Sequence, residues 1–230
     1  MTSRPSVRAP VERQRDADRT QAEILEVAGR EFARHGYDGA RVDEIAALTR
    51  TTKRMIYYYF GGKEGLYIKV LEDAYIRVRN VERSLDVEHL GPVEAMRTLA
   101  ELTFDFHEAN GDFIRLVSIE NIHHAEHIQK SEVLPNLGSP AVEVLDRILK
   151  AGRASGDFAV DADAVDVHIL ISSFCFFRIA NQPTFGALFG RDMTDPRHRP
   201  RLRRMIADML IAYLRGQGDP GNAPTTRPEP

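Results

Sequence analysis

The sequence predicts an all-α protein. Between its two ends, apolar residues recur with the 3.6-residue period of helices, and β-branched alternation is nearly absent. No Asn-Gly or Asp-Gly hairpin signal separates alternating apolar runs. Proline and glycine instead stand where helices would begin and end. These observations predict a chain of helices joined by short connections.

The composition limits the class of protein. The chain has 230 residues, 43% of them hydrophobic, which is enough for a substantial core. A single cysteine, Cys175, excludes an intramolecular disulfide framework, and its apolar neighbours favour a buried structural thiol over a redox sensor. We find no signal peptide and no run of 18 apolar residues, so we expect a cytoplasmic protein without a membrane partner.

The first three predicted helices cover residues 18–35, 42–48 and 53–60. The first has one apolar stripe and ends before Gly36, a residue suited to a left-handed helix end. Arg50, Thr51 and Thr52 separate the two short helices, and a Thr hydroxyl there can cap the second one. Two short helices joined by a tight turn, after a longer packing helix, form a helix-turn-helix unit.

Six further helices are predicted, at about residues 63–81, 92–109, 112–127, 140–154, 164–181 and 200–214. Either Asp161 or Asp163 could cap the fifth of these. We expect a disordered basic arm at 1–15, a helix-turn-helix domain at 16–62, a larger helical domain at 63–215 and a disordered tail at 216–230.

The second short helix has an unusual composition for a packing helix. It holds Lys53, Arg54 and three successive tyrosines within seven residues. In a major groove, the first residues of such a helix reach base edges, while Tyr hydroxyls and cations donate to phosphates. Residues 61–63 then begin the next helix, whose free backbone N–H groups and Lys63 could hold a phosphate. The charge is also asymmetric, with 12 Lys+Arg against 10 Asp+Glu through Leu66 and 19 against 24 after it.

At these positions the sequence resembles the TetR family of bacterial transcriptional regulators over about residues 18–71. The resemblance rests on Gly36-Tyr37, Val42-Asp43-Glu44-Ile45-Ala46, Ile56-Tyr57-Tyr58-Tyr59-Phe60 and Lys63-Glu64-Gly65-Leu66. It implies an all-helical homodimer that binds double-stranded operator DNA and responds to a small-molecule effector. It does not imply a cofactor. We expect a repressor that binds a pseudo-palindromic operator and is released by the effector, with an activator as the alternative that the sequence leaves open.

The resemblance also implies the DNA contacts. They fall on Arg41, Thr51, Thr52, Lys53, Arg54, Met55, Tyr57, Tyr58, Tyr59 and Lys63. The sequence departs from the family pattern in two places. Ala40 and Arg41 stand where Thr or Ser usually caps the second helix, and Arg41 could replace that cap with a phosphate contact. Arg50 stands in the turn where Gly is favoured for its backbone freedom, so it could bend the turn differently or add another cation.

The C-terminal half offers apolar walls with a few polar groups, the usual make-up of a ligand pocket. The candidates are Phe104, Phe106, His107, Phe113, Arg115, Leu116, Glu120, Asn121, His124, Phe176, Phe177 and Arg178. The ordinary alternative is that the phenylalanines belong to the core and that the arginines are ion-paired on the surface.

A histidine cluster provides an alternative function. His123 and His127 have the i, i+4 spacing that can chelate zinc on a helix, and Glu120 and His124 share it on a neighbouring face. A helical metal-dependent hydrolase is therefore the alternative reading. It lacks further ligands such as a Cys pair and leaves the tyrosine-rich helix unexplained, so we predict neither a metal nor an enzyme.

The last predicted helix carries an apolar stripe wide enough for a helix-bundle seam. Its members are Leu202, Met205, Ile206, Met209, Leu210, Tyr213 and Leu214. We expect this stripe and the preceding helix to form the dimer interface. The alternative is that both helices pack only within their own subunit.

Overall fold

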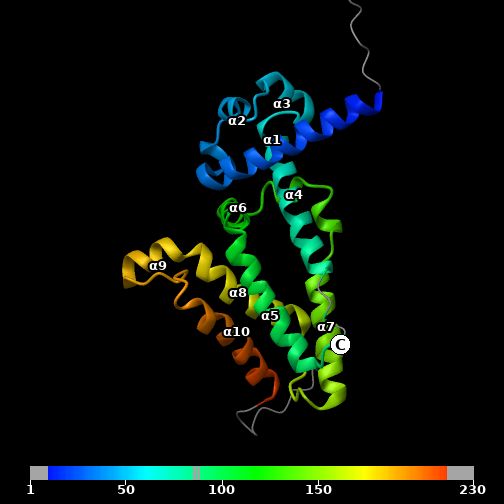
Figure 1. Ribbon diagram of the computed structural model, residues 1–230, viewed down its shortest axis with the longest axis vertical. Coiled ribbons are helices and arrows are strands. Elements are labelled where there is room, and N and C mark those ends of the chain that lie inside the picture. The colour runs from blue at the N-terminus through cyan, green and yellow to red at the C-terminus, as the bar shows by residue number, and fades with distance from the viewer. Residues whose placement is uncertain (1–9, 85–86, 88, 217–230) are drawn as a thin grey trace, which may run out of the picture. The chain divides into compact units, whose positions relative to one another are not determined.

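The computed structural model describes residues 10–84, 87 and 89–216, and these residues are almost entirely helical (Figure 1). No β-strand occurs among them, so the predicted all-α class is confirmed. Most of the expected arm and nearly all of the expected tail lie outside the described residues. Residues 10–15, which the sequence assigned to the arm, are instead the start of the first helix.

The helices, in chain order, are α1 (Pro10–Gly39), α2 (Val42–Leu48), α3 (Lys53–Phe60), α4 (Lys63–Arg83), α5 (Pro92–Ala109), α6 (Gly111–Ile122), α7 (Pro140–Ser155), α8 (Ala164–Ala180), α9 (Gln182–Phe189) and α10 (Arg199–Leu214). Two short 3₁₀ turns, η1 (Ile128–Lys130) and η2 (Leu134–Asn136), follow α6. The sequence did not predict α9. It also placed the end of α6 five residues too late.

The chain divides into two compact units, and the division differs from the expected boundary after residue 62. The N-terminal unit comprises residues 1–80 and 111–138, and the C-terminal unit comprises 81–110 and 139–230. α6 and the two 3₁₀ turns therefore belong with the helix-turn-helix. α4 supplies most of its length to the N-terminal unit and its last residues to the other.

The core of the N-terminal unit is built by α1, α2, α3, α4 and α6. Phe32, Ile45, Ile56, Leu66 and Tyr67 are fully buried together in it. α1 runs as one helix except at Gly36, where a positive φ of 73° interrupts it, as expected of that glycine. This core fixes the orientation of the two short helices.

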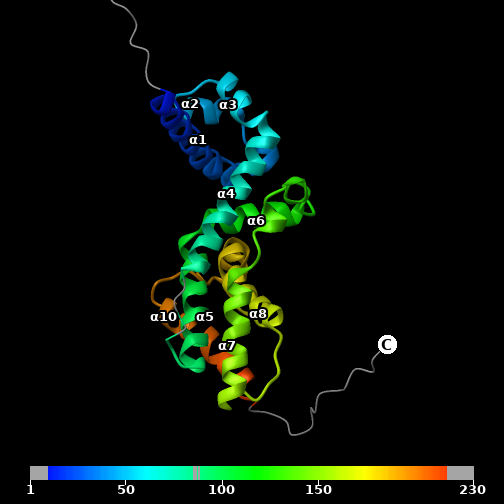
Figure 2. The same cartoon turned by 90° about the vertical axis from the view of Figure 1, so that its right-hand side faces the viewer.

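The C-terminal unit is a bundle in which α5 packs against α7, α8 and α10 (Figure 2). Asp163 caps α8, since its side chain accepts hydrogen bonds from the N–H groups of Val165 and Asp166. Cys175 is buried in this core, and burial raises the pKa of its thiol to about 12, in agreement with the structural role expected.

No single described helix is long and apolar enough to cross a membrane. The pair α8 and α9, bent by 67° at their junction, meets the length and composition criterion together.

Candidate DNA-binding site and ligand site

The turn between α2 and α3 is fixed by local hydrogen bonds. The Thr52 side chain accepts from the N–H of Met55 at 3.3 Å, which is the N-cap expected for α3. The buried Thr49 hydroxyl donates to the Ile45 carbonyl at 2.8 Å. Arg50 has a φ of 52°, so it occupies the left-handed conformation that favours glycine. This conformation places some backbone strain in Arg50.

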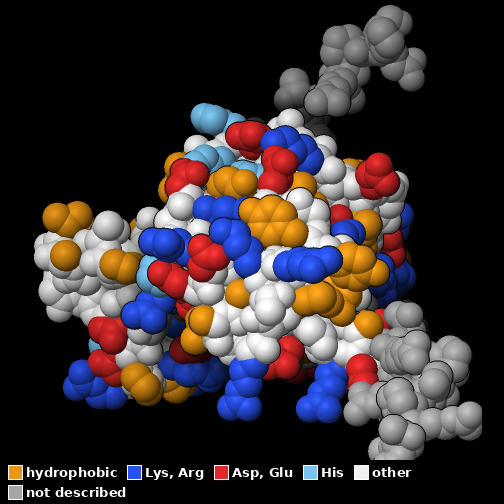
Figure 3. Space-filling view, turned by 90° about the horizontal axis from the view of Figure 1, so that it is seen from above, with side chains coloured by type: hydrophobic (Ala, Val, Ile, Leu, Met, Phe, Trp, Pro, Cys, Tyr) orange, Lys and Arg blue, Asp and Glu red, His pale blue; other side chains and the backbone are white. Residues whose placement is uncertain are grey.

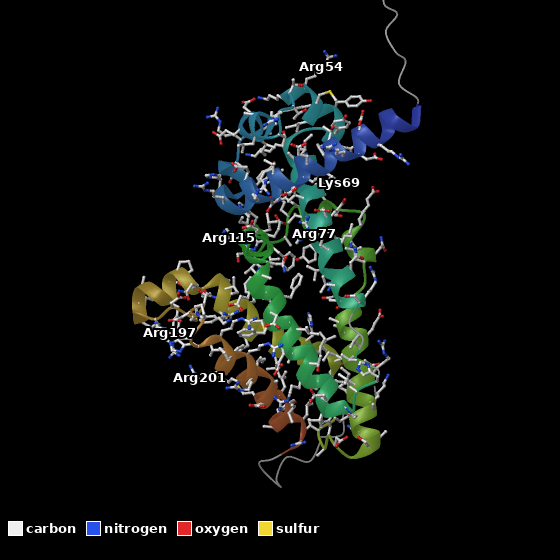
Figure 4. The ribbon with its side chains drawn as sticks, viewed as in Figure 1. Arg54, Lys69, Arg77, Arg115, Arg197 and Arg201 are labelled. Carbon is white, nitrogen blue, oxygen red and sulfur yellow. The ribbon has the colours of Figure 1, made fainter. Side chains whose placement is uncertain are left out.

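α3 has one buried face and one exposed face. Ile56 is fully buried, whereas Tyr58 is 77% exposed and Tyr57 is 48% exposed. Tyr59 packs partly against the core of the N-terminal unit and edge-on against Tyr58. Arg54 stands clear of the ribbon in Figure 4 and forms no ion pair within the described part of the chain. The exposed side chains of α3 are thus two tyrosines and two cations, Lys53 and Arg54, which need a polar partner.

Neighbouring carboxylates hold two cations, Lys53 at the start of α3 and Arg41 just before α2. Lys53 lies 3.1 Å from Asp43 of α2, and Arg41 lies 3.8 Å from Glu44. Arg41 precedes α2 without capping it, since its side chain makes no cap hydrogen bond. All four side chains are more than half exposed, so these pairs are weak and can exchange for phosphates.

Lys63 begins α4 and is held near the end of α1. Its Nζ donates to the Asp38 carbonyl at 3.0 Å and lies 4.9 Å from the centre of the Tyr37 ring. The first bond of the α4 ladder runs from Leu66 N to the Gly62 carbonyl. The N–H groups of the first turn therefore precede the ladder and are available to an anion.

Close backbone contact fixes α3 against α4. Gly61 ends α3 with a φ of 76°. A Cβ on Gly65 would lie 1.9 Å from the Phe60 carbonyl oxygen, so only glycine allows α3 and α4 to approach this closely. The glycines of this segment position both α3 and the N-terminus of α4.

Figure 3 views the molecule from above. Lys and Arg side chains there lie between hydrophobic and acidic ones and do not form one continuous basic patch. Charge alone therefore does not define the site. The candidate DNA-binding site is indicated instead by the turn, the exposed tyrosines and the dispersed cations together.

The predicted ligand residues are divided between the two compact units. Phe113, Arg115, Leu116, Glu120, Asn121 and His124 lie in the N-terminal unit, and Phe104, His107, Phe177 and Arg178 lie in the C-terminal unit. Within the N-terminal unit Leu116 is core, while Arg115 is exposed and paired with Asp112 at 3.2 Å.

The histidine cluster is not arranged as the spacing suggested. α6 ends at Ile122, and His124 and Ala125 take φ values of 53° and 59°, so the i, i+4 relation on a helix is lost. Glu120 is instead fully buried and accepts from the backbone N–H groups of His127 and Ile128 and from His127 Nδ1, which lies at 3.0 Å. Among the described residues, no three His, Cys, Asp or Glu side chains gather as a possible metal site. The metal-chelating geometry was wrong, because the helix does not continue through His127.

His107 is also internal. Its Nδ1–H donates to the Thr103 carbonyl at 3.0 Å, and burial lowers the pKa of its ring to about 4. At neutral pH the ring is uncharged and fills space within the C-terminal unit.

Phe177 and Arg178 line a cavity of about 610 Å³ between α8, α9 and α10. This volume is in the range of small-molecule sites. Its apolar walls include Phe174, Phe185, Met193, Leu202 and Met205, and its cations are Arg178, Arg191 and Arg201. Arg178 is buried and stacks on Phe104, with the guanidinium 4.0 Å from the ring centre. Phe185, Arg191 and Met193 were missed because the segment after Asn181 was left unassigned, although Pro183 and the apolar run to Phe189 are helix signals.

The expected dimer stripe on α10 divides into two faces. Ile206, Leu210 and Leu214 are buried in the core of their own subunit, so their assignment to the interface was wrong. Met209 and Tyr213 are each 50% exposed. α8 likewise exposes Val165, Ile169, Leu170 and Phe177. The apolar stripe of α10 is wide enough to cover both a buried face and an exposed face. The periodicity of the sequence alone does not show which of its residues lie on which face.

The N-terminal unit has the geometry of a helix-turn-helix DNA-binding protein, and comparison with known proteins agrees. Residues 24–70 match the family model described as bacterial regulatory proteins, tetR family, and residues 92–210 match the tetracyclin repressor-like C-terminal domain. The chain therefore belongs to the TetR family, and its function is that of a ligand-responsive DNA-binding repressor.

Individual relatives support the same family. The HTH-type transcriptional repressor NicS of Pseudomonas putida is 34% identical over 203 residues, which cover 88% of this chain and 96% of NicS. The repressor SCO4008 of Streptomyces coelicolor is 37% identical over 110 residues, which cover 47% of this chain and 53% of SCO4008. The crystal structure of the transcriptional regulator SCO4942 from the same species superposes with a TM-score of 0.61 at 30% identity, covering 83% of this chain and 97% of SCO4942. The first two are named as repressors, and none of these findings supports the hydrolase alternative.

Proposed function

We propose that two copies of this chain bind a pseudo-palindromic operator, with α3 of each copy in a major groove. The observation that carries the proposal is the exposed face of α3, where Arg54, Tyr57 and Tyr58 project from a helix fixed by its cap and turn. Centres of the two half-sites would lie about 34–36 Å apart, one turn of the duplex. A protein that must reach chromosomal DNA would act in the cytoplasm.

Residues along α3 would have different tasks. Those at its N-terminal end enter the groove first and are proposed to read base edges: Thr51, Thr52, Lys53, Arg54 and Met55. The tyrosines and flanking cations would contact phosphates: Arg41, Tyr57, Tyr58, Tyr59 and Lys63. Lys53 would exchange Asp43 for DNA, and Lys63 can keep the Asp38 carbonyl while a second N–H donates to a phosphate.

Selection of bound duplexes from a random pool tests the proposal. We expect two inverted half-sites and an affinity that falls steeply with salt, since phosphate contacts release counterions. Arg54→Ala should relax the selected sequence at one position of each half-site, whereas Arg83→Ala at the far end of α4 should leave it unchanged. If the native protein selects no common sequence, the proposed operator binding is wrong.

We also propose that the exposed faces of α8 and α10 join two copies in an isologous four-helix contact. Met209 and Tyr213 of α10 would meet Val165 and Ile169 of α8 and their symmetry mates. Large apolar side chains left exposed on adjacent helices of one unit support this, because they are typical of an obligate interface.

An effector would release DNA by changing the separation of the two α3 helices. α4 begins beside α3 and ends in the C-terminal unit, so it is the element through which the change would pass. A 100-fold loss of DNA affinity requires about 2.7 kcal/mol of coupling. Spin labels on Arg54 of each subunit measure the separation. An effector that releases DNA without altering that distance distribution would exclude this mechanism.

A further inference from the structure

The cavity between α8, α9 and α10 combines an apolar lining with an excess of positive charge. Arg178, Arg191 and Arg201 line it, and no acidic residue is among its lining residues in the described part of the chain. The remainder of the lining is aromatic and aliphatic except for Ser173. A pocket intended for a neutral apolar molecule has no need of three guanidinium groups.

The buried member of the trio is incompletely paired. Arg178 Nη1 donates to the Met193 carbonyl at 3.2 Å and to Glu108 at 3.5 Å. Its Nη2 lies 3.3 Å from Glu108, but no described residue supplies a hydrogen-bond acceptor to Nη2 or Nε. Glu108 is shared, since it also accepts from Arg199 at 2.8 Å. A buried donor without an acceptor destabilises the empty site, and an anion entering the cavity can supply the missing acceptor.

The neighbouring charges do not neutralise the cavity. Glu101, Asp105 and Glu108 are matched by Arg178, Arg199 and Arg203 in one ion-pair network, so the three carboxylates are fully used. Arg191 and Arg201 form no hydrogen bond or ion pair through their side chains within the described residues. Both are exposed at the cavity, and Figure 4 shows Arg201 projecting from α10. The cavity is thus lined by two exposed arginines without a partner among the described residues, Arg191 and Arg201, and by the buried Arg178.

We infer that this cavity binds an amphipathic organic anion, with a carboxylate or phosphate held by the arginines and an aromatic or short alkyl body against the phenylalanines. Guanidinium groups bind both head groups with paired N–H donors. The inference rests on the proposed effector-responsive function and assigns the chemical class of the effector and its location. It places the ligand beside α8 and α10, the helices proposed to form the dimer.

Paired fluorescent probes test the anion requirement on the full-length protein in its native oligomeric state. 8-Anilinonaphthalene-1-sulfonate carries one anionic group, and N-phenyl-1-naphthylamine has the same aromatic body without it. We expect the sulfonate to bind at least about tenfold more tightly than the neutral probe. Equal affinities, or no binding of the sulfonate because a second subunit fills the cavity, would overturn the inference.

Charge-matched variants locate the site. Arg191→Gln/Arg201→Gln should weaken the sulfonate about tenfold and leave the neutral probe unchanged. Arg204→Gln/Arg215→Gln removes the same charge from exposed positions outside the cavity lining and should change neither. These four positions are exposed, so the variants avoid the folding risk of altering Arg178. Equal loss of sulfonate binding in both double variants would show a general charge effect and refute the site.

The position of the probe can be read directly. The chain contains no tryptophan, so Phe185→Trp places the sole tryptophan in the cavity wall. Its emission should be quenched by energy transfer to the bound sulfonate, and decanoate or decyl phosphate, but not decanol, should restore it. The anion that displaces the sulfonate probe at the lower concentration, decanoate or decyl phosphate, shows whether the site prefers a carboxylate or a phosphate. No displacement by either anion would count against the inference, while operator binding by the same samples reports separately on the proposed function.

Discussion

The two compact units both leave large apolar side chains exposed, but the chemistry of those side chains differs. α3 exposes Tyr57 and Tyr58, each with a hydroxyl, next to Lys53 and Arg54. α8 and α10 expose mainly aliphatic, methionine and phenylalanine side chains such as Ile169 and Met209, together with Tyr213. The first surface suits a hydrated, charged partner such as DNA, whereas the second requires a partner that excludes water. The difference agrees with the two proposed roles, DNA recognition by α3 and dimer assembly by α8 and α10.

The largest expected effect comes from placing a charge on the apolar surface. Met209→Arg should raise the dimer dissociation constant at least about 1000-fold, or about 4 kcal/mol, because two symmetry-related arginines would be desolvated close together. Equilibrium sedimentation measures this. Met209→Leu keeps an apolar side chain and should remain dimeric. A stable Met209→Arg dimer would refute the proposed interface.

Two glycine substitutions compare the packing of the units. Gly65→Ala sets a Cβ against the Phe60 carbonyl and should cost about 3 kcal/mol of stability, since backbone on both sides must move. Gly152→Ala meets only the Phe158 ring, at 2.0 Å, so the ring can shift and the cost should be about 1–2 kcal/mol. Urea unfolding followed by circular dichroism gives both values. A larger loss of stability for Gly152→Ala than for Gly65→Ala would mean that the α3–α4 contact is not packed more tightly than the contact of Gly152 with Phe158.

Substitutions on the α3 surface should weaken operator binding without changing assembly. Tyr58→Ala should reduce affinity about tenfold, because a side chain 77% exposed contributes little to the fold. The unfolding midpoint and the dimer should be retained. Unchanged operator affinity would remove Tyr58 from the site.

Removal of one phosphate contact should have a smaller, specific effect. Lys63→Ala should reduce the slope of log affinity against log salt by about one. Lys69→Ala is the matched control on α4, because Lys69 pairs with Glu72 and lies outside the proposed contacts. Equal slopes for Lys63→Ala and the native protein would exclude the contact.

The smallest effect concerns the turn. Arg50→Gly should stabilise the protein by about 0.5–1 kcal/mol, because glycine adopts the φ of 52° without strain. Arg54→Gly within α3 should instead destabilise it by about 1 kcal/mol. Thermal unfolding distinguishes the two. Destabilisation by Arg50→Gly would indicate that the Arg50 side chain makes contacts worth more than its strain.

The sequence by itself determined the features that depend on neighbouring residues. The bounds of α2 and α3 and the Thr52 cap follow from local hydrogen bonding and backbone sterics. The family could be inferred from the same short motifs.

Only the tertiary structure decided which residues from distant segments share a site. It buried Glu120 against His127, divided the ligand candidates between two units, and assigned Ile206 and Leu210 to the core of their own subunit. It also brought Arg178, Arg191 and Arg201 around one cavity. A helical period shows that a side chain has an apolar environment. It does not show which helix supplies that environment, because this depends on packing between segments far apart in the chain.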